Sequence, residues 1–307
     1  MQELFRGERM RSLVLSGGGA KGAYQCGILK HLLGELQVHY NILTGVSVGA
    51  INAAFLAMYP DGMEKQAADD LYKLWDQLNT LQVYKRFFPF GRFHALWEKS
   101  FFDSSPLHDL IHKNISLDRI RETEKQVCVG AVSLCSGKYS LFTQQDDDFI
   151  EAVIASASFP GLLSPVWIRN QWWADGGVKS VSPVAAALEI GADEIDVLMT
   201  SPETRNKNFI ENPNILDIFK RTIDLASDKI MSNDLEKAIM YNRLAEAGVS
   251  KKKMVKLNVI RPDYNLTDNI LDFDPIKLKK MMDLGYEDAK KKYMINDTNN
   301  MASGVGV

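Results

Sequence analysis

The amino-acid sequence predicts an α/β fold in which parallel strands are joined by helical crossovers. The apolar run at residues 11–16 is typical of a buried strand, and residues 23–36 carry apolar side chains at helical spacing. Residues 40–46 form a second apolar run, and a helix of small residues is expected directly after it, over 48–58. Strand, helix, strand and helix at this spacing place the two strands side by side and parallel.

The later chain continues this alternation. We expect residues 61–124 to be mostly helical, strand pairs that turn at Gly137 and at Asn170, and a helix capped by Gly191 that leads into a strand. The remaining expected elements are a helix ended by Pro160, a helix within 213–248, a strand at 254–262 and a closing helix over 274–293. Without repeats or a Pro/Ser-rich linker, we expect an N-terminal extension (1–10), one domain (11–292) and a disordered tail (293–307).

The composition limits the classes of function. The chain has 307 residues, of which 46% are hydrophobic and 24% charged, as in an ordinary folded protein with a sizeable core. A net charge of −3 argues against binding nucleic acid through bulk positive charge. We expect a cytoplasmic protein, because there is no apolar leader, no apolar run long enough to cross a bilayer, and no disulfide pattern among Cys26, Cys128 and Cys135.

A glycine-rich loop directly follows the first predicted strand. Gly17, Gly19 and Gly22 match G-x-G-x-x-G between a strand and a helix, which is the setting of a dinucleotide-binding loop. That function also needs an acidic residue at the end of the second strand, where the chain instead reads TGVSVG at 44–49. The residues after Lys21 do not fit a P-loop either. Nucleotide binding is therefore a disfavoured alternative.

The end of the second strand carries a candidate nucleophile. Gly45, Ser47 and Gly49 form G-x-S-x-G between a strand and a helix, the arrangement of a nucleophile elbow. The glycines allow the sharp turn, and the helix N-terminus adds partial positive charge beside the serine. The simpler alternative is a small-residue turn with a helix-capping serine.

The two motifs together suggest ester chemistry. Adjacent parallel strands would bring the glycine loop beside Ser47, and serine attack on an ester carbonyl creates a tetrahedral oxyanion. Backbone N–H groups stabilise such a charge, and glycines let them approach closely. We therefore predict that Gly17, Gly18 and Gly19 form an oxyanion hole.

The base that would activate Ser47 is predicted to be a carboxylate. In α/β-hydrolases the histidine comes last in the chain, but no histidine here lies beyond His112. Asp175 follows an apolar stretch that would bury it and raise its pKa, and two glycines after it permit a tight turn. Taken alone, Asp175 could equally belong to an ordinary Asp-Gly turn.

In this order, the motifs GGGAKG at 17–22, GVSVG at 45–49 and DGG at 175–177 resemble the patatin-like phospholipase family. The stretches 155–166, 182–193 and 271–289 resemble it too, so the similarity runs from about residue 11 to residue 292. It implies a three-layer α/β/α fold with a Ser47–Asp175 dyad. It also implies that Lys21 and Gly22 shape the oxyanion loop and that Gly45, Gly49, Gly176 and Gly177 support the motifs. One departure is Ser180, where members often carry asparagine, and we expect it to affect local hydrogen bonding more than chemistry.

The resemblance implies a serine acyl-hydrolase, a phospholipase A or lysophospholipase, that cleaves fatty acyl esters of phospholipids through an acyl-enzyme, without a metal or cofactor. An acyltransferase with the same dyad and a non-catalytic lipid- or nucleotide-binding module remain as alternatives. Four phenylalanines mixed with basic residues at 84–93 suit an anionic lipid interface, although they could instead close the substrate groove or pack in the core. We therefore expect a phospholipid or related ester as substrate, peripheral membrane contact and no nucleic acid.

Overall fold

The central feature of the computed structural model, which describes residues 9–86, 99–203, 215–249 and 253–303, is one mixed β-sheet. Within these residues the strand order is β10-β9-β1-β2-β5-β8-β7, with β6 beside β5. The strands β10, β9, β1, β2 and β5 are parallel, and the strands β6, β7 and β8 add antiparallel pairs at one end. Their bounds are β1 Arg11–Leu15, β2 Ile42–Gly45, β5 Gln126–Ser133, β6 Tyr139–Thr143, β7 Val166–Ile168, β8 Gln171–Asp175, β9 Glu194–Leu198 and β10 Lys256–Ile260.

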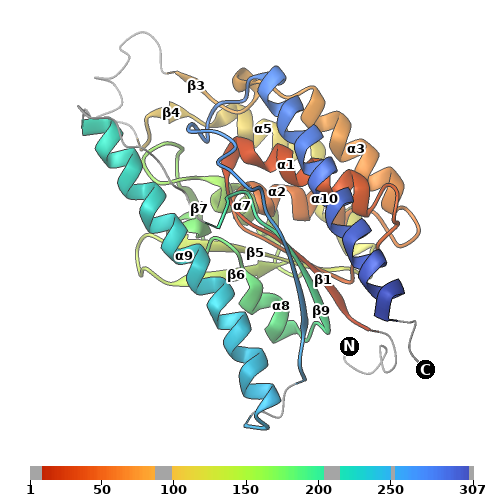
Figure 1. Ribbon diagram of the computed structural model, residues 1–307. Helices are drawn as coiled ribbons and strands as arrows, with labels where there is room; N and C mark the ends of the chain where they lie inside the picture. Colours follow the sequence, from red (N-terminus) through yellow and green to blue (C-terminus); the bar gives the residue numbers. More distant parts are fainter. Residues whose placement is uncertain (1–8, 87–98, 204–214, 250–252, 304–307) are drawn as a thin grey trace.

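Helices cover both faces of this sheet (Figure 1). One face carries α1 (Gly22–Leu32), α2 (Val48–Ala57), α3 (Glu64–Asp76), α5 (Ser105–Asn114), α6 (Leu117–Arg121), α7 (Phe149–Ala157) and α10 (Pro275–Ser303). The other face carries α8 (Val184–Ile190) and the long α9 (Ile215–Glu246). The expected three-layer α/β/α fold with a mostly parallel sheet is therefore confirmed.

The alternation of side chains along β1 explains why both faces must be covered. Leu13 and Leu15 belong to the core beneath α1, α2 and α10, whereas Val14 belongs to the core beneath α8 and α9. In the next strand Leu43 and Ile42 divide in the same way. Because neighbouring residues of a strand point to opposite faces, an apolar run of this kind is stable only between two helical layers.

Strand β5 aligns the two strands that carry the predicted site. Its first half pairs with β2, with Gly45 opposite Val129, and its second half pairs with β8, with Asp175 opposite Ala131. The strand β6 pairs with residues of β5 in both halves, so β6 occupies the opposite edge. The strands β2 and β8 therefore share one edge of β5 and meet there end to end.

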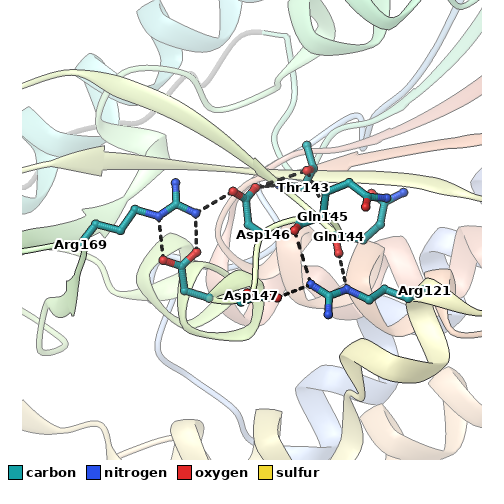
Figure 2. Close-up of polar contacts among 8 residues, drawn as sticks. Arg121, Thr143, Gln144, Gln145, Asp146, Asp147 and Arg169 are labelled. Carbon is teal, nitrogen blue, oxygen red and sulfur yellow. Dashed lines mark hydrogen bonds and ion pairs between the residues drawn. The ribbon is translucent and has the colours of Figure 1, made fainter. Parts of the chain in front are cut away.

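An ion-pair network fastens the turns that flank α7 and β8 (Figure 2). The Arg169 guanidinium, in the turn between β7 and β8, donates to Asp146 at 2.6 Å and to Asp148 at 2.7 Å. From α6, Arg121 donates to the Gln144 carbonyl at 2.8 Å and to Asp147 at 2.8 Å. These exposed pairs contribute little energy singly, but together they link the start of α7 to the hairpin that ends at Asp175.

Three features differ from the sequence-based expectations or lie beyond them. The helix α10 continues to Ser303, past residue 293, where we expected a disordered tail to begin. The segment 61–124 contains, besides its helices, a small sheet of β3 (Lys85–Arg86) and β4 (Phe102–Asp103). Most of the aromatic and basic patch, namely Phe87, Phe88, Phe90, Arg92 and Phe93, lies outside the described residues.

Candidate active site

Ser47 occupies a tight turn between β2 and α2. Its backbone has φ 57° and ψ −129°, a conformation that is sparsely populated for any residue except glycine. The turn needs Gly49, since a Cβ there would lie 2.1 Å from the Leu15 carbonyl oxygen. The Ser47 amide donates to Ser156 Oγ at 3.0 Å, and the Ser156 hydroxyl donates to the Gly130 carbonyl at 2.6 Å. Neighbouring elements thus hold the strained turn in place.

Asp175 is the last residue of β8, and its side chain points to Ser47. Asp175 is 2% exposed, and its carboxylate accepts a hydrogen bond from the Gly177 amide at 2.7 Å. The carboxylate also lies close enough to the Ser47 hydroxyl for that hydroxyl to favour its charged form. The Asp175 amide donates to the Ser158 carbonyl at 3.0 Å, which fixes the strand end against the segment after α7. The side chains of Ser47 and Asp175, expected to meet, are therefore in contact.

The electrostatic setting of Asp175 differs from that of a surface carboxylate. Burial raises the pKa of Asp175 to about 7, although the nearby Ser47 hydroxyl and the Gly177 amide oppose this shift by favouring the charged form. A carboxylate with a pKa near neutrality can accept a proton and return it during one reaction cycle. The arrangement is therefore suited to general-base chemistry on the Ser47 hydroxyl.

The glycine loop lies directly against Ser47. A Cβ on Gly17 would be 3.2 Å from the Ser47 Cβ, so the bare backbone permits this approach. The Gly17 amide, however, donates to the Val181 carbonyl at 2.9 Å. Among the described residues the amides of Gly18 and Gly19 have no acceptor, so they are the donors available to an oxyanion. We expected the Gly17 amide to donate to the oxyanion too. Because it is occupied by Val181, Gly17 instead contributes only the close approach of the loop to Ser47.

The other motif residues are buried or closely packed around the glycine loop and the serine turn. Lys21 is buried, lines the pocket described below and donates to Asn265 Oδ1 at 3.3 Å. A Cβ on Gly22 would lie 2.4 Å from Val48 Cγ2, and one on Gly45 would lie 2.2 Å from the Gly49 carbonyl oxygen. Gly176 packs against strand β5, where a Cβ would lie 2.3 Å from the Gly130 carbonyl oxygen.

A pocket of about 150 Å³ opens over Ser47, Asp175 and the glycine loop. Apart from its polar groups, its walls are mainly apolar, and they come from α2, α3, α5, α9, the segment after α7 and the segment before α10. Representative wall residues are Ile51, Leu74, Leu110, Leu163, Met231 and Phe273. A pocket of this composition is suited to a hydrocarbon chain, with the reacting group at the polar end.

The described histidines lie away from this pocket. His31, His39, His108 and His112 are not among the residues that line it, and His94 lies outside the described part of the chain. Burial lowers the pKa of His108, which lies on α5. Among the described residues, Asp175 is therefore the titratable group whose pKa responds to the Ser47 hydroxyl.

One group of side chains could hold a metal ion. His39, Asp61 and Glu64 offer ligand atoms within 4.8 Å of one another, but none of them lines the pocket. They already pair among themselves, with His39 Nε2 3.3 Å from Asp61 and His39 Nδ1 3.2 Å from Glu64. The sequence-based expectation of a metal-free reaction stays a prediction.

Sequence reasoning missed several supporting residues. Ser156 lies in the 155–166 stretch that resembles the family, but its contact with Ser47 joins parts of the chain far apart in sequence. Val181, which anchors Gly17, and Thr200 Oγ1, which donates to the Gly17 carbonyl at 2.5 Å, carried no motif signal. Such partners become visible only once the sheet order is known.

Three curated proteins illustrate the relatives of this chain. It is 26% identical over 204 residues to the cGAMP-activated phospholipase of Escherichia coli (strain TW11681). The aligned region covers 57% of this chain and 54% of that protein. It is 25% identical over 277 residues to Probable lipid hydrolase 463L of Invertebrate iridescent virus 6. This alignment covers 81% of this chain and 92% of the viral protein. Against the Calcium-independent phospholipase A2-gamma of Rattus norvegicus it is 25% identical, covering 60% of this chain and 26% of that one. The chain thus spans about half or less of two of these relatives.

Among solved structures, VipD from Legionella pneumophila aligns with 92% of this chain and 66% of its own, at 14% identity and a TM-score of 0.45. No helix in the described part of the chain combines the length and apolar character needed to cross a membrane. The family profile described as Patatin-like phospholipase matches residues 13–188, which include the glycine loop, the serine turn and Asp175. This chain therefore belongs to the patatin-like phospholipase family, a family of lipid hydrolases.

Proposed function

We propose that this protein is a serine acyl-hydrolase that cleaves fatty acyl esters of phospholipids, with Ser47 as nucleophile and Asp175 as general base. The observation that carries the proposal is the close approach of the Ser47 hydroxyl to the buried Asp175 carboxylate, whose pKa it lowers. Beside this pair lie two amides that have no acceptor among the described residues. The family membership and the phospholipase names of the relatives support the substrate class.

In the first half of the proposed reaction, Ser47 Oγ attacks the ester carbonyl carbon and its proton passes to Asp175. The carbonyl oxygen becomes an oxyanion, which the Gly18 and Gly19 amides stabilise; removal of one such donor typically costs about 3 kcal/mol. The tetrahedral intermediate then collapses, the bond to the alcohol breaks, and Asp175 returns the proton to the departing oxygen. The product of this half-reaction is an acyl-Ser47 ester.

In the second half, water replaces the alcohol. Asp175 removes a proton from the water as its oxygen attacks the acyl carbon, and the same amides stabilise the second oxyanion. Collapse releases the fatty acid, and the proton held by Asp175 returns to Ser47 Oγ. One group thus serves as base and acid in turn, which a pKa of about 7 favours.

The pocket supports an acyl chain as the recognised part of the substrate. Ser47 lines it together with apolar side chains such as Leu110 and Phe273. Burying methylene groups there stabilises the complex by about 0.8 kcal/mol for each CH₂ fully removed from water. An ester with a long acyl chain is therefore a better substrate than a short one at equal concentration.

Acyl transfer to an alcohol would use the same acyl-Ser47 intermediate. The experiment that tests the proposal incubates the protein with phospholipid vesicles, with and without added glycerol, and separates the products by mass spectrometry. We expect free fatty acid and lysophospholipid from wild type in both cases, and neither product from Ser47→Ala. Acyl glycerol in place of fatty acid would indicate a transferase, and equal release by the variant would exclude Ser47 as nucleophile.

A further inference from the structure

The long helix α9 connects the pocket to the glycine loop through one buried carboxylate. Ile223, Ser227 and Met231 of this helix line the pocket. Asp234 lies about one turn further along the same helix and is 6% exposed. Its position on α9, on the far side of the sheet from α1 and α2, carried no motif signal in the sequence.

A single oxygen of Asp234 organises three consecutive residues. Asp234 Oδ2 accepts from the Ser180 hydroxyl at 3.1 Å, from the Val181 amide at 2.9 Å and from the Ser182 amide at 3.0 Å. Ser180 is the position at which this chain departs from the family pattern, and its hydroxyl is one of the three donors. The two backbone amides have fixed directions, so the carboxylate determines the course of the chain at this point.

Residues 180–182, which Asp234 holds, connect directly to the proposed oxyanion hole. The Val181 carbonyl accepts the Gly17 amide at 2.9 Å. Gly17 immediately precedes the two amides for which the described part of the chain offers no acceptor. On its other side the segment continues back to Asp175, because the Ser180 amide donates to the Gly176 carbonyl at 2.9 Å. Asp234 is therefore linked through residues 180–182 to the segment that follows the base and to the loop of oxyanion donors. It does not touch the reacting atoms.

From these contacts we infer that Asp234 is a positioning residue, which holds residues 180–182 so that Val181 keeps the Gly17–Gly19 loop aligned with Ser47. The inference rests on the proposed function. Since oxyanion donors must point at the place where charge develops, a loop that loses its anchor loses stabilisation of the transition state more than binding of the substrate. The expected signature is a lower kcat at nearly constant KM.

The test compares Asp234→Ala, Asp234→Asn and the matched control Glu236→Ala, an exposed acidic residue on the same helix. Three quantities are measured: the rate of Ser47 labelling by a fluorophosphonate, kcat and KM on a soluble short-chain ester, and amide hydrogen exchange in peptides that cover 13–22 and 176–183. We expect Asp234→Ala to lower kcat and the labelling rate at least about 10-fold, with KM within about 2-fold, and to accelerate exchange in both peptides.

Asp234→Asn keeps an oxygen that can accept the same donors, so it should restore most of the lost rate. If Asp234→Ala does not fold, Asp234→Asn should still exchange faster than Glu236→Ala in these two peptides and nowhere else. Labelling and exchange equal to those of Glu236→Ala would overturn the inference. Wild-type protein that neither reacts with the probe nor cleaves the ester would refute the proposed function instead, and exchange alone would then decide the role of Asp234.

Discussion

Gly45 and Asp175 pair with the same edge of β5, at positions only two residues apart. Gly45 lies opposite Val129, and Asp175 lies opposite Ala131. Because β2 arrives parallel and β8 antiparallel, their carboxyl ends face each other across this short interval. The chain leaves β2 at the turn that carries Ser47, so its hydroxyl reaches the Asp175 carboxylate without a long side chain. The contact on which the proposed chemistry depends is therefore a consequence of strand pairing.

The first prediction concerns the pH dependence of activity. Asp175 must be ionised to accept the Ser47 proton, and burial raises the pKa of Asp175 to about 7. We expect kcat/KM for an uncharged soluble ester to rise about tenfold per pH unit below pH 7 and to level off above it. A pH–rate profile under conditions where the fold is intact measures this directly. Activity that stays constant from pH 8 down to pH 5 would contradict the role of Asp175 as base.

The second prediction concerns the free energy of unfolding. Between about pH 4, the ordinary value for Asp, and pH 7, native Asp175 holds a proton that the unfolded chain releases, so wild type loses stability as pH rises through this window. Asp175→Asn lacks this penalty and should be more stable than wild type at pH 8, by at most about 4 kcal/mol. The gain should shrink toward pH 4. Denaturant unfolding of both proteins at several pH values measures this difference in unfolding free energy. A difference that does not change with pH would contradict the raised pKa of Asp175.

The third prediction separates backbone strain from crowding at the glycine loop. Gly19 has φ 58°, and a Cβ there would lie 2.2 Å from the Ile270 carbonyl oxygen; Gly137 has φ 68° but nothing within 4 Å. Each change to alanine carries the cost of a left-handed residue, about 1–2 kcal/mol. Gly19→Ala should in addition displace an oxyanion donor and lower kcat at least about 100-fold. Gly137→Ala should keep wild-type kcat, and equal kcat in both variants would argue against the loop assignment.

The fourth prediction tests the apolar wall of the pocket. Leu110 lines it, whereas Leu81 is 69% exposed and does not. Leu110→Trp should shorten the space for the acyl chain, so kcat/KM for a C16 ester should fall at least about 10-fold relative to that for a C4 ester. Leu81→Trp is the matched control and should leave the ratio unchanged. A constant ratio in Leu110→Trp would place the acyl chain elsewhere.

Much of the fold was predictable because its signals are local. The continuous apolar runs of β1 and β2, the helix ended before Pro160, the turn at Asn170 and the left-handed cap at Gly191 each depend on neighbouring residues. The extent of α10 was not predictable in this way. A polar, small-residue sequence lacks the periodic apolar signal that marks a helix, so the segment up to Ser303 was expected to be disordered.

The candidate site shows the same division between local and distant information. Ser47, Asp175 and the three glycines could be chosen because strand-turn-helix and Asp-Gly-Gly patterns are contiguous in the chain. The occupied Gly17 amide could not be foreseen, since its acceptor Val181 belongs to a distant segment. The supports from Ser156 and Asp234 likewise depend on pairs more than a hundred and more than fifty residues apart in sequence, respectively.

Fluorophosphonate labelling followed by peptide mapping tests the proposed dyad most directly. The probe forms a stable covalent bond only with a serine that is activated by a base and aligned with an oxyanion hole. We predict a single label on Ser47, no label in Ser47→Ala, and labelling at least about 100-fold slower in Asp175→Asn. A label on a different serine, or an unchanged rate in Asp175→Asn, would contradict the assignment of Ser47 and Asp175 as a catalytic pair.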